Sequence, residues 1–201
     1  MLEPEDLKRA GALCRETLQP YVEGDWSNPA GDLRWSCQET LDHLSGVLLW
    51  YSVQLATRAR EGMAAVTPTQ AIPNSIANLS AVLAEVAAAA SPTDRGWHRQ
   101  GMADRTGFLA MGTDEVLVHT NDIAVAFGGS FQPPADLCKK VVERLFPWAP
   151  SDVEPWQVLL WCNGRIALPG RERLDPGWGW QSAPLEEWDG VPRTGGYGRP
   201  R

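Results

Sequence analysis

The chain has 201 residues, of which 43% are hydrophobic and 21% charged, and its formal net charge is −7. This length and composition fit one globular domain with a sizeable core and, at most, a small appendage. The negative charge argues against nucleic acid as a partner, because a nucleic-acid binder presents a basic face. No stretch approaches the roughly 18 uncharged apolar residues of a membrane-spanning helix, so we expect no membrane segment.

The cysteines are scattered along the chain without a CxxC pair, at Cys14, Cys37, Cys138 and Cys162. Free thiols of this kind are typical of a reducing compartment. The start, MLEPEDLKRA, lacks the basic residues and apolar run of a signal peptide. The sequence therefore predicts a cytoplasmic protein without a disulfide framework. Cys37 falls in the first turn of a predicted helix, where the dipole can lower a thiol pKa, but a buried structural thiol is the favoured interpretation.

Apolar residues recur at helical spacing through the first half of the chain. This pattern predicts helices over residues 4–21, 37–60 and 73–90. The second helix opens with a capping box of Ser36 and Glu39, in which each side chain accepts a backbone N–H of the other residue. The connections around these helices, including residues 61–72, are predicted to be loops because they carry glycine, proline and polar residues.

In the second half, a longer connection over 91–106 precedes a helix over 107–127, which is expected to end at the Gly128-Gly129 pair. Pro133-Pro134 then opens a fifth, amphipathic helix. The stretch PWQVLLWCNGRIALPG fits either a sixth short helix or a strand, since periodicity cannot decide between them. The remaining chain, from Pro169, is predicted to be irregular and packed on the body by its Trp residues, with the last residues, RTGGYGRPR, frayed.

These long amphipathic stretches predict an all-α fold built on a four-helix bundle. Residues 1–150 are expected to form the bundle, and residues 151–201 a C-terminal extension with a short helix and an irregular tail rich in Trp, Gly and Pro. A Trp-rich tail is also suited to an interface, so a homodimer is possible.

The stretch DEVLVHTND places three ionisable side chains on one face of the fourth predicted helix. Glu115, His119 and Asp122 follow one another at steps of four and three residues. Glu115 and His119 can both reach one cation, and a third ligand must come from another helix. His98 lies in a loop, whereas His43 lies within the second helix. The sequence therefore predicts a divalent-metal site of two histidines and one carboxylate with open positions, in which Asp122 hydrogen-bonds a ligand histidine.

Other interpretations remain open from spacing alone. An ExxxH pair also fits a salt-bridged Glu and His on a solvated helix face, and His43 by itself fits a satisfied core or surface histidine. Trp50, about two turns after His43, lies on the same helical face and fits either pocket lining or core packing. Arg165 is a candidate contact for a substrate anion, although a surface role is favoured.

Two segments resemble a known family. WSCQETLDHLSG resembles the W-[ST]-x-x-[DE]-x-x-x-H-L segment of the DinB-like helix-bundle superfamily. EVLVHTND resembles the E-x-x-x-H-x-x-D segment of its actinobacterial branch, the mycothiol-dependent maleylpyruvate isomerase-like metal-binding domains. Glu115 matches this branch, because other DinB-like proteins usually carry His there. The resemblance covers about residues 4–130 and implies an up-down four-helix bundle that holds a divalent metal, typically zinc, with the residues matching His43, Glu115 and His119.

The resemblance also implies thiol chemistry. WQVLLWCNGRIALPG is similar to the tail of short family members without the second domain, so maleylpyruvate itself is not the expected substrate. The implied function is a metal-dependent S-transferase or isomerase whose small-molecule partners are mycothiol and an electrophile. Two alternatives stand beside it. One is a metal-dependent hydrolase, in which the metal activates water, and the other is a non-catalytic metal-binding or regulatory bundle.

Overall fold

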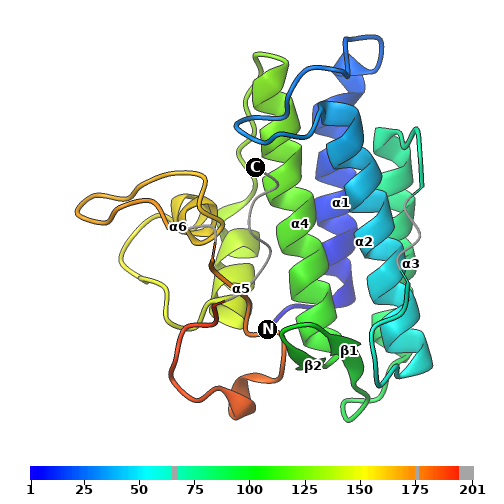
Figure 1. Ribbon diagram of the computed structural model, residues 1–201, viewed down its shortest axis with the longest axis vertical. Coiled ribbons are helices and arrows are strands. Elements are labelled where there is room, and N and C mark those ends of the chain that lie inside the picture. Colours follow the sequence, from blue (N-terminus) through cyan, green and yellow to red (C-terminus); the bar gives the residue numbers. More distant parts are fainter. Residues whose placement is uncertain (65–67, 175–176, 195–201) are drawn as a thin grey trace.

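The computed structural model describes residues 1–64, 68–174 and 177–194, and within them the protein is mainly helical (Figure 1). Its six α-helices are α1 (Pro4–Leu18), α2 (Cys37–Thr57), α3 (Pro73–Ala89), α4 (Arg105–Ala126), α5 (Ala135–Leu145) and α6 (Pro155–Cys162). Two antiparallel strands, β1 (Gly96–His98) and β2 (Gly101–Ala103), form a small hairpin. Among the described residues, no helix combines the length and the apolar character needed to cross a membrane.

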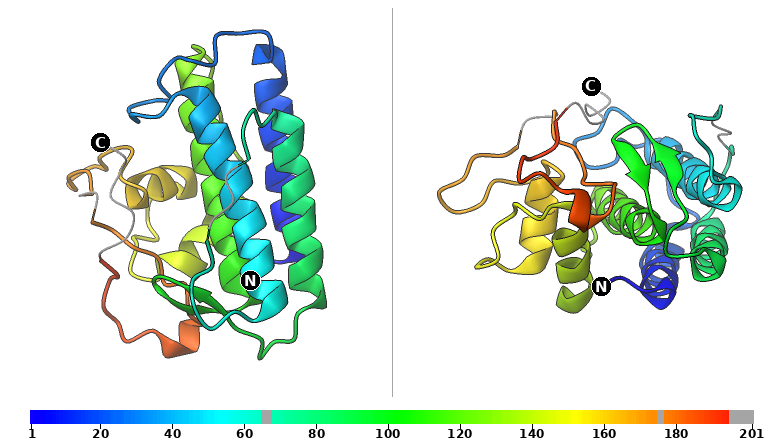
Figure 2. Two further views of the ribbon diagram at one scale, coloured as in Figure 1. Left: turned by 45° about the vertical axis from the view of Figure 1, so that its right-hand side comes forward. Right: turned by 90° about the horizontal axis from the view of Figure 1, so that it is seen from below.

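The first four helices form a bundle in which α1 and α2 each pack against both α3 and α4. The ends of the helices show their directions. Gln38, at the start of α2, donates to the carbonyl of Ala71, just before α3. Arg105, at the start of α4, donates to the carbonyl of Ala90, just after α3. Helices α1 and α4 therefore run one way and α2 and α3 the other (Figures 1 and 2).

This order, up-down-down-up, differs from the simple up-down alternation that the family resemblance implied. The reason is the long connection between Thr57 and Pro73. An extended chain of its length spans up to about 50 Å, whereas a 21-residue helix such as α2 is only about 31 Å long, so the connection can return along the bundle. Its end is fastened to α2, because Asp42 accepts the backbone N–H of Ala71 at 2.7 Å. Residues 65–67 of the predicted loop lie outside the described residues.

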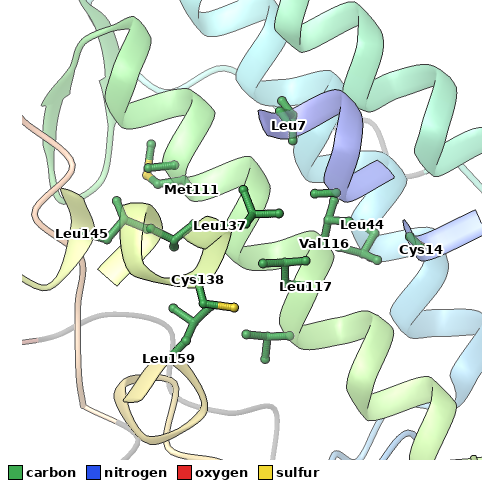
Figure 3. Close-up of a cluster of buried hydrophobic side chains, with 14 of the residues drawn as sticks. Leu7, Cys14, Leu44, Met111, Val116, Leu117, Leu137, Cys138, Leu145 and Leu159 are labelled. Atoms are coloured by element: carbon green, nitrogen blue, oxygen red, sulfur yellow. The ribbon is translucent and has the colours of Figure 1, made fainter. Parts of the chain in front are cut away.

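Helix α4 is the central helix of the molecule. Helices α1, α2 and α3 pack on it from one side and α5 and α6 from the other (Figure 3). Every residue from 107 to 120 is buried as a result. Polar side chains on a helix that is covered all round must be paired or bound to a metal, because burial of an unpaired charge is costly.

The expected helices are present, with bounds that differ by a few residues. Helix α4 begins earlier than predicted, because the Asp104 side chain caps it by accepting the N–H of Gly107 at 2.7 Å. The hairpin interrupts the predicted connection 91–106 and packs near the end of α2 (Figure 2). The undecided stretch after residue 154 forms α6, capped by the Glu154 carboxylate.

The C-terminal extension packs on the bundle and shares its core. Helix α6 lies on α5, and one hydrophobic cluster includes Trp156, Leu159 and Trp180 together with the side chains of the bundle. Trp180 is only 2% exposed, and its ring lies 5.6 Å from that of Trp178. The described tail is irregular apart from one short 3₁₀ turn, Leu185–Glu187. Residues 195–201, part of the end that we expected to be frayed, lie outside the described residues.

Candidate metal site

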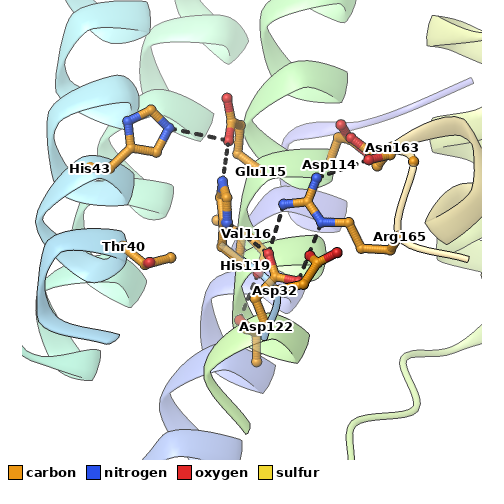
Figure 4. A network of polar contacts seen from close by, with 12 residues as sticks. Asp32, Thr40, His43, Asp114, Glu115, Val116, His119, Asp122, Asn163 and Arg165 are labelled. Carbon is orange, nitrogen blue, oxygen red and sulfur yellow. Dashed lines mark hydrogen bonds and ion pairs between the residues drawn. The ribbon is translucent and has the colours of Figure 1, made fainter. Parts of the chain in front are cut away.

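Three predicted ligands from two helices meet inside the bundle (Figure 4). His43 lies in the second turn of α2, which the Ser36–Glu39 capping box starts as predicted. Its Nε2 atom is 3.5 Å from Oε2 of Glu115, and the same oxygen is 3.1 Å from Nε2 of His119. The three side chains can therefore present two nitrogens and one oxygen to the same point, and this cluster could hold a metal ion.

The spacing of these atoms fits a small divalent cation. One ligand atom from each side chain lies within 4.8 Å of the other two. A tetrahedral zinc ion with bonds of about 2.0–2.2 Å separates its ligand atoms by about 3.3–3.6 Å, so only small movements are needed. Three protein ligands leave a fourth position for water or a substrate atom.

The cluster is buried, which excludes the solvated helix face as its setting. The side chains of Glu115 and His119 are 9% and 10% exposed, and that of His43 is 25% exposed, so the site reaches solvent on the α2 side. Burial opposes ionisation of Glu115, but hydrogen bonds from His119 and His43 hold its pKa well below the usual range. Burial likewise opposes the imidazolium of His119, but hydrogen bonds with Asp122 and Glu115 raise its pKa to about 9. Without metal, the cluster therefore holds an ion pair.

Asp122 lies behind His119, as the helical spacing predicted. Its Oδ2 atom is 3.0 Å from Nδ1 of His119, the ring nitrogen that faces away from Glu115. A hydrogen bond at Nδ1 fixes the ring and leaves Nε2 free as the ligand atom.

Arg165 contacts Asp122 from the C-terminal extension (Figure 4). Its side chain is 9% exposed, so the surface role that we favoured from the sequence is wrong. The guanidinium donates to both carboxylate oxygens of Asp122, and its Nη1 donates to the carbonyl of Asn163. This pairing could not be predicted from the sequence because 43 residues separate the partners. The predicted contact of Arg165 with a substrate anion stays a prediction.

The aromatic residues near the ligands occupy different places. The Trp35 ring packs 4.7 Å from that of His43. Trp50 lies toward the hairpin, where its indole N–H donates to the carbonyl of Met63 and its ring lies 6.2 Å from that of His98. His98 is buried and does not belong to the cluster of the three candidate ligands, and burial lowers its pKa to about 4. Lining of a substrate pocket by Trp50 stays a prediction.

Tyr51 lies near the candidate ligands and was not predicted from the sequence. Its hydroxyl lies 3.5 Å from Oε1 of Glu115, the carboxylate oxygen that does not face the histidines. The available signal was its position eight residues after His43, which places both side chains on one face of α2. Its contact helps to direct the other oxygen of Glu115 toward the two histidines.

Asp114 is a second buried carboxylate beside the site. It accepts hydrogen bonds from Nδ2 of Asn163 and Nε1 of Trp180, at 2.8 and 3.0 Å. Burial, reinforced by the nearby charge of Glu115, raises its pKa to about 7. These contacts join α6 and the tail to the central helix next to the candidate metal ligands.

Comparisons of the chain with protein-family models, with curated proteins and with solved structures gave no match. The fold and the site by themselves define a helical protein with a bundle of four helices and a cluster of two histidines and one glutamate that is suited to a metal ion.

The pKa of His119 predicts how the stability of the metal-free protein depends on pH. Because the folded-state pKa of about 9 lies above the ordinary value of 6.5, the folded protein binds this proton more tightly. Its contribution is complete below about pH 6.5 and is lost as the pH rises through about 9. We expect the free energy of unfolding, measured by urea denaturation in the presence of a chelator, to fall by on the order of 3 kcal/mol across this window.

The cysteines and Asp114 also titrate in or near this pH range, and they remain in the variant His119→Gln, which lacks only the imidazole. The stability of this variant should therefore vary less over the same pH range. Zinc-loaded protein should also show a flatter profile, because the metal takes the place of the proton. Equal slopes for the wild-type protein and His119→Gln would contradict this assignment.

Proposed function

We propose that this protein is a divalent-metal-dependent enzyme that uses a small-molecule thiol, mycothiol, as an S-transferase or isomerase of small electrophiles. The proposal includes membership of the DinB-like superfamily, on the motif residues around His43 and His119. The observation that carries it is the convergence of His43, Glu115 and His119, which supply three ligands and leave a position for a fourth.

The ligand set suits activation of a nucleophile. When bound, a divalent metal would lower the pKa of a coordinated thiol and so supply a thiolate near neutral pH. Glu115 brings one negative charge to the site, which partly offsets a dipositive ion. Asp122 holds the ring of His119, and the exposed side of His43 gives a route to solvent. These side chains would bind and orient the metal, and the sulfur of the thiol would occupy the fourth ligand position.

The cysteines of the chain support an external thiol. All four are buried, and burial raises the pKa of Cys14 and Cys138 to about 12 and that of Cys37 to about 11. Burial also raises the pKa of Cys162 well above its ordinary value. Because the thiolate is the reactive form, these side chains are unsuited to act as nucleophiles at neutral pH. The buried structural role predicted for Cys37 agrees with this placement.

A turnover assay tests the proposal. Zinc-loaded protein is mixed with mycothiol and a panel of small electrophiles, including monochlorobimane as a fluorogenic acceptor and an activated alkene. We expect conjugation or isomerisation above the uncatalysed rate, saturable in thiol, and lost on chelation. The matched control is the variant Glu115→Gln, which keeps the shape of the side chain and removes the charged ligand.

The same assay separates the alternatives. Turnover of an activated ester such as p-nitrophenyl acetate without any added thiol would favour a hydrolase. A protein that binds zinc but accelerates none of these reactions would favour a non-catalytic metal-binding module.

A further inference from the structure

The extension contributes a layer of side chains behind the ligand His119. Asp122 is 3% exposed, and its carboxylate stands between the ring of His119 on one side and the guanidinium of Arg165 on the other. Nη2 of Arg165 is 2.7 Å from Oδ2 of Asp122, and Nε is 3.3 Å from Oδ1. These two contacts make a forked pair, the geometry in which an arginine holds a carboxylate most firmly.

The pair is needed because Asp122 could not stay charged and buried alone. Without Arg165, the carboxylate would lose the forked contact that orients it, and its hydrogen bond with Nδ1 of His119 would be less well directed. The loop before α2 closes another side, where a Cβ on Gly31 would lie 3.5 Å from Asp122. The carboxylate is therefore held by its surroundings within hydrogen-bonding distance of Nδ1 of His119.

Arg165 is itself held in place. Its backbone N–H donates to the carbonyl of Leu160 at 2.7 Å, and its Nη1 donates to that of Asn163 at 2.9 Å. Gly164, between Asn163 and Arg165, has φ +63°, a conformation that suits glycine and turns the chain after α6. The Asn163 side chain is anchored to Asp114 on α4. The turn after α6 thus presents one guanidinium at a fixed place behind the site.

We propose that Arg165 is a positioning residue of the metal site, which acts on His119 through Asp122 and sets the metal affinity without touching the metal. The inference rests on the part of the proposed function that places a metal at His43, Glu115 and His119. It is independent of the thiol chemistry. It also assigns a function to the C-terminal extension, because Arg165 belongs to the extension and His119 to the bundle.

A double-mutant cycle tests the path through Asp122. Zinc affinity is measured by competition with a chromophoric chelator for the wild-type protein, Arg165→Gln, Asp122→Asn and the double variant. We expect Arg165→Gln to weaken zinc binding by about 10- to 100-fold, the range for loss of a residue that orients a ligand. In the Asp122→Asn background, the same change should weaken zinc binding by less than about a further twofold, because the carboxylate through which Arg165 acts on His119 is already absent.

A spectroscopic readout separates positioning from a general loss of stability. The ligand-field spectrum of the cobalt(II)-substituted protein should change in Arg165→Gln and be restored in part by Arg165→Lys, which keeps the charge without the fork. Arg171→Gln is the matched control, since Arg171 lies in the same extension with its guanidinium over the Trp161 ring and should leave both readouts unchanged. Should Arg165→Gln fail to fold, Arg165→Lys takes its place in the same double-mutant cycle.

Wild-type zinc affinity in Arg165→Gln, or an equal loss in both backgrounds, would overturn the proposal. A wild-type protein that bound no zinc would refute the metal site and this inference together. Zinc binding that follows the expected cycle, but without thiol-dependent turnover, would refute the proposed function alone and support the inference.

Discussion

The variant Glu115→Gln is expected to bind zinc on the order of a thousandfold more weakly than the wild-type protein. Zinc sites built by proteins are worth about 10–16 kcal/mol, so removal of one charged ligand among three removes several kcal/mol. Glu115 has the largest share, because its Oε2 atom faces both histidines, at 3.1 and 3.5 Å. Gln keeps the shape of the side chain but supplies a neutral oxygen.

Chelator competition and metal analysis of the purified variant measure this effect. Circular dichroism shows that the variant is folded. Glu143→Gln is the matched control, since Glu143 is an exposed residue of α5 and undergoes the same chemical change. Unchanged zinc affinity in a folded Glu115→Gln protein would show that any bound metal lies elsewhere.

The variant Trp180→Ala is expected to lose about 3–5 kcal/mol of the free energy of unfolding, the usual cost of truncating a buried Trp. Trp180 is 2% exposed and packs with Trp178 and His98. It also donates its indole N–H to Asp114, so truncation leaves a buried carboxylate with one partner fewer. The loss is large beside the 5–15 kcal/mol total typical of native proteins.

Urea denaturation measures this effect, with Trp188→Ala as the control. Trp188 also lies in the tail, but it is only partly buried, and its indole N–H donates to the nearby Val191 carbonyl. Its truncation should cost about 1 kcal/mol or less. Similar losses for the two variants would mean that the tail does not depend on Trp180 for its attachment to α4.

Much of the local structure could be predicted from the sequence, because it depends on neighbouring residues. The 3.6-residue spacing of apolar side chains predicted the helices. The capping box predicted the start of α2, which both contacts of Ser36 and Glu39 confirm. The hairpin over Gly96–Ala103 was not predicted, because each strand has three residues, too few for an alternating pattern.

In the candidate site, too, the local part could be predicted from the sequence and the rest depended on packing. The steps between Glu115, His119 and Asp122 made their shared face a property of the helix itself, and His43 was the candidate third ligand because it lies within the second predicted helix. Whether α2 would turn His43 toward α4 depended on packing, and the structure places its Nε2 within 3.5 Å of Glu115. Spacing could not distinguish a solvated ion pair from a buried one, because the difference lies in what covers α4.

The sequence by itself determined the helices, their caps and the side chains that share a face of α4, since hydrogen bonds and periodicity within a helix are local. Only the tertiary structure decided that α3 runs parallel to α2, that the extension covers α4, and that Arg165 holds Asp122. A long connection permits either helix direction, and a pair separated by 43 residues forms only when packing of the core brings its two segments together.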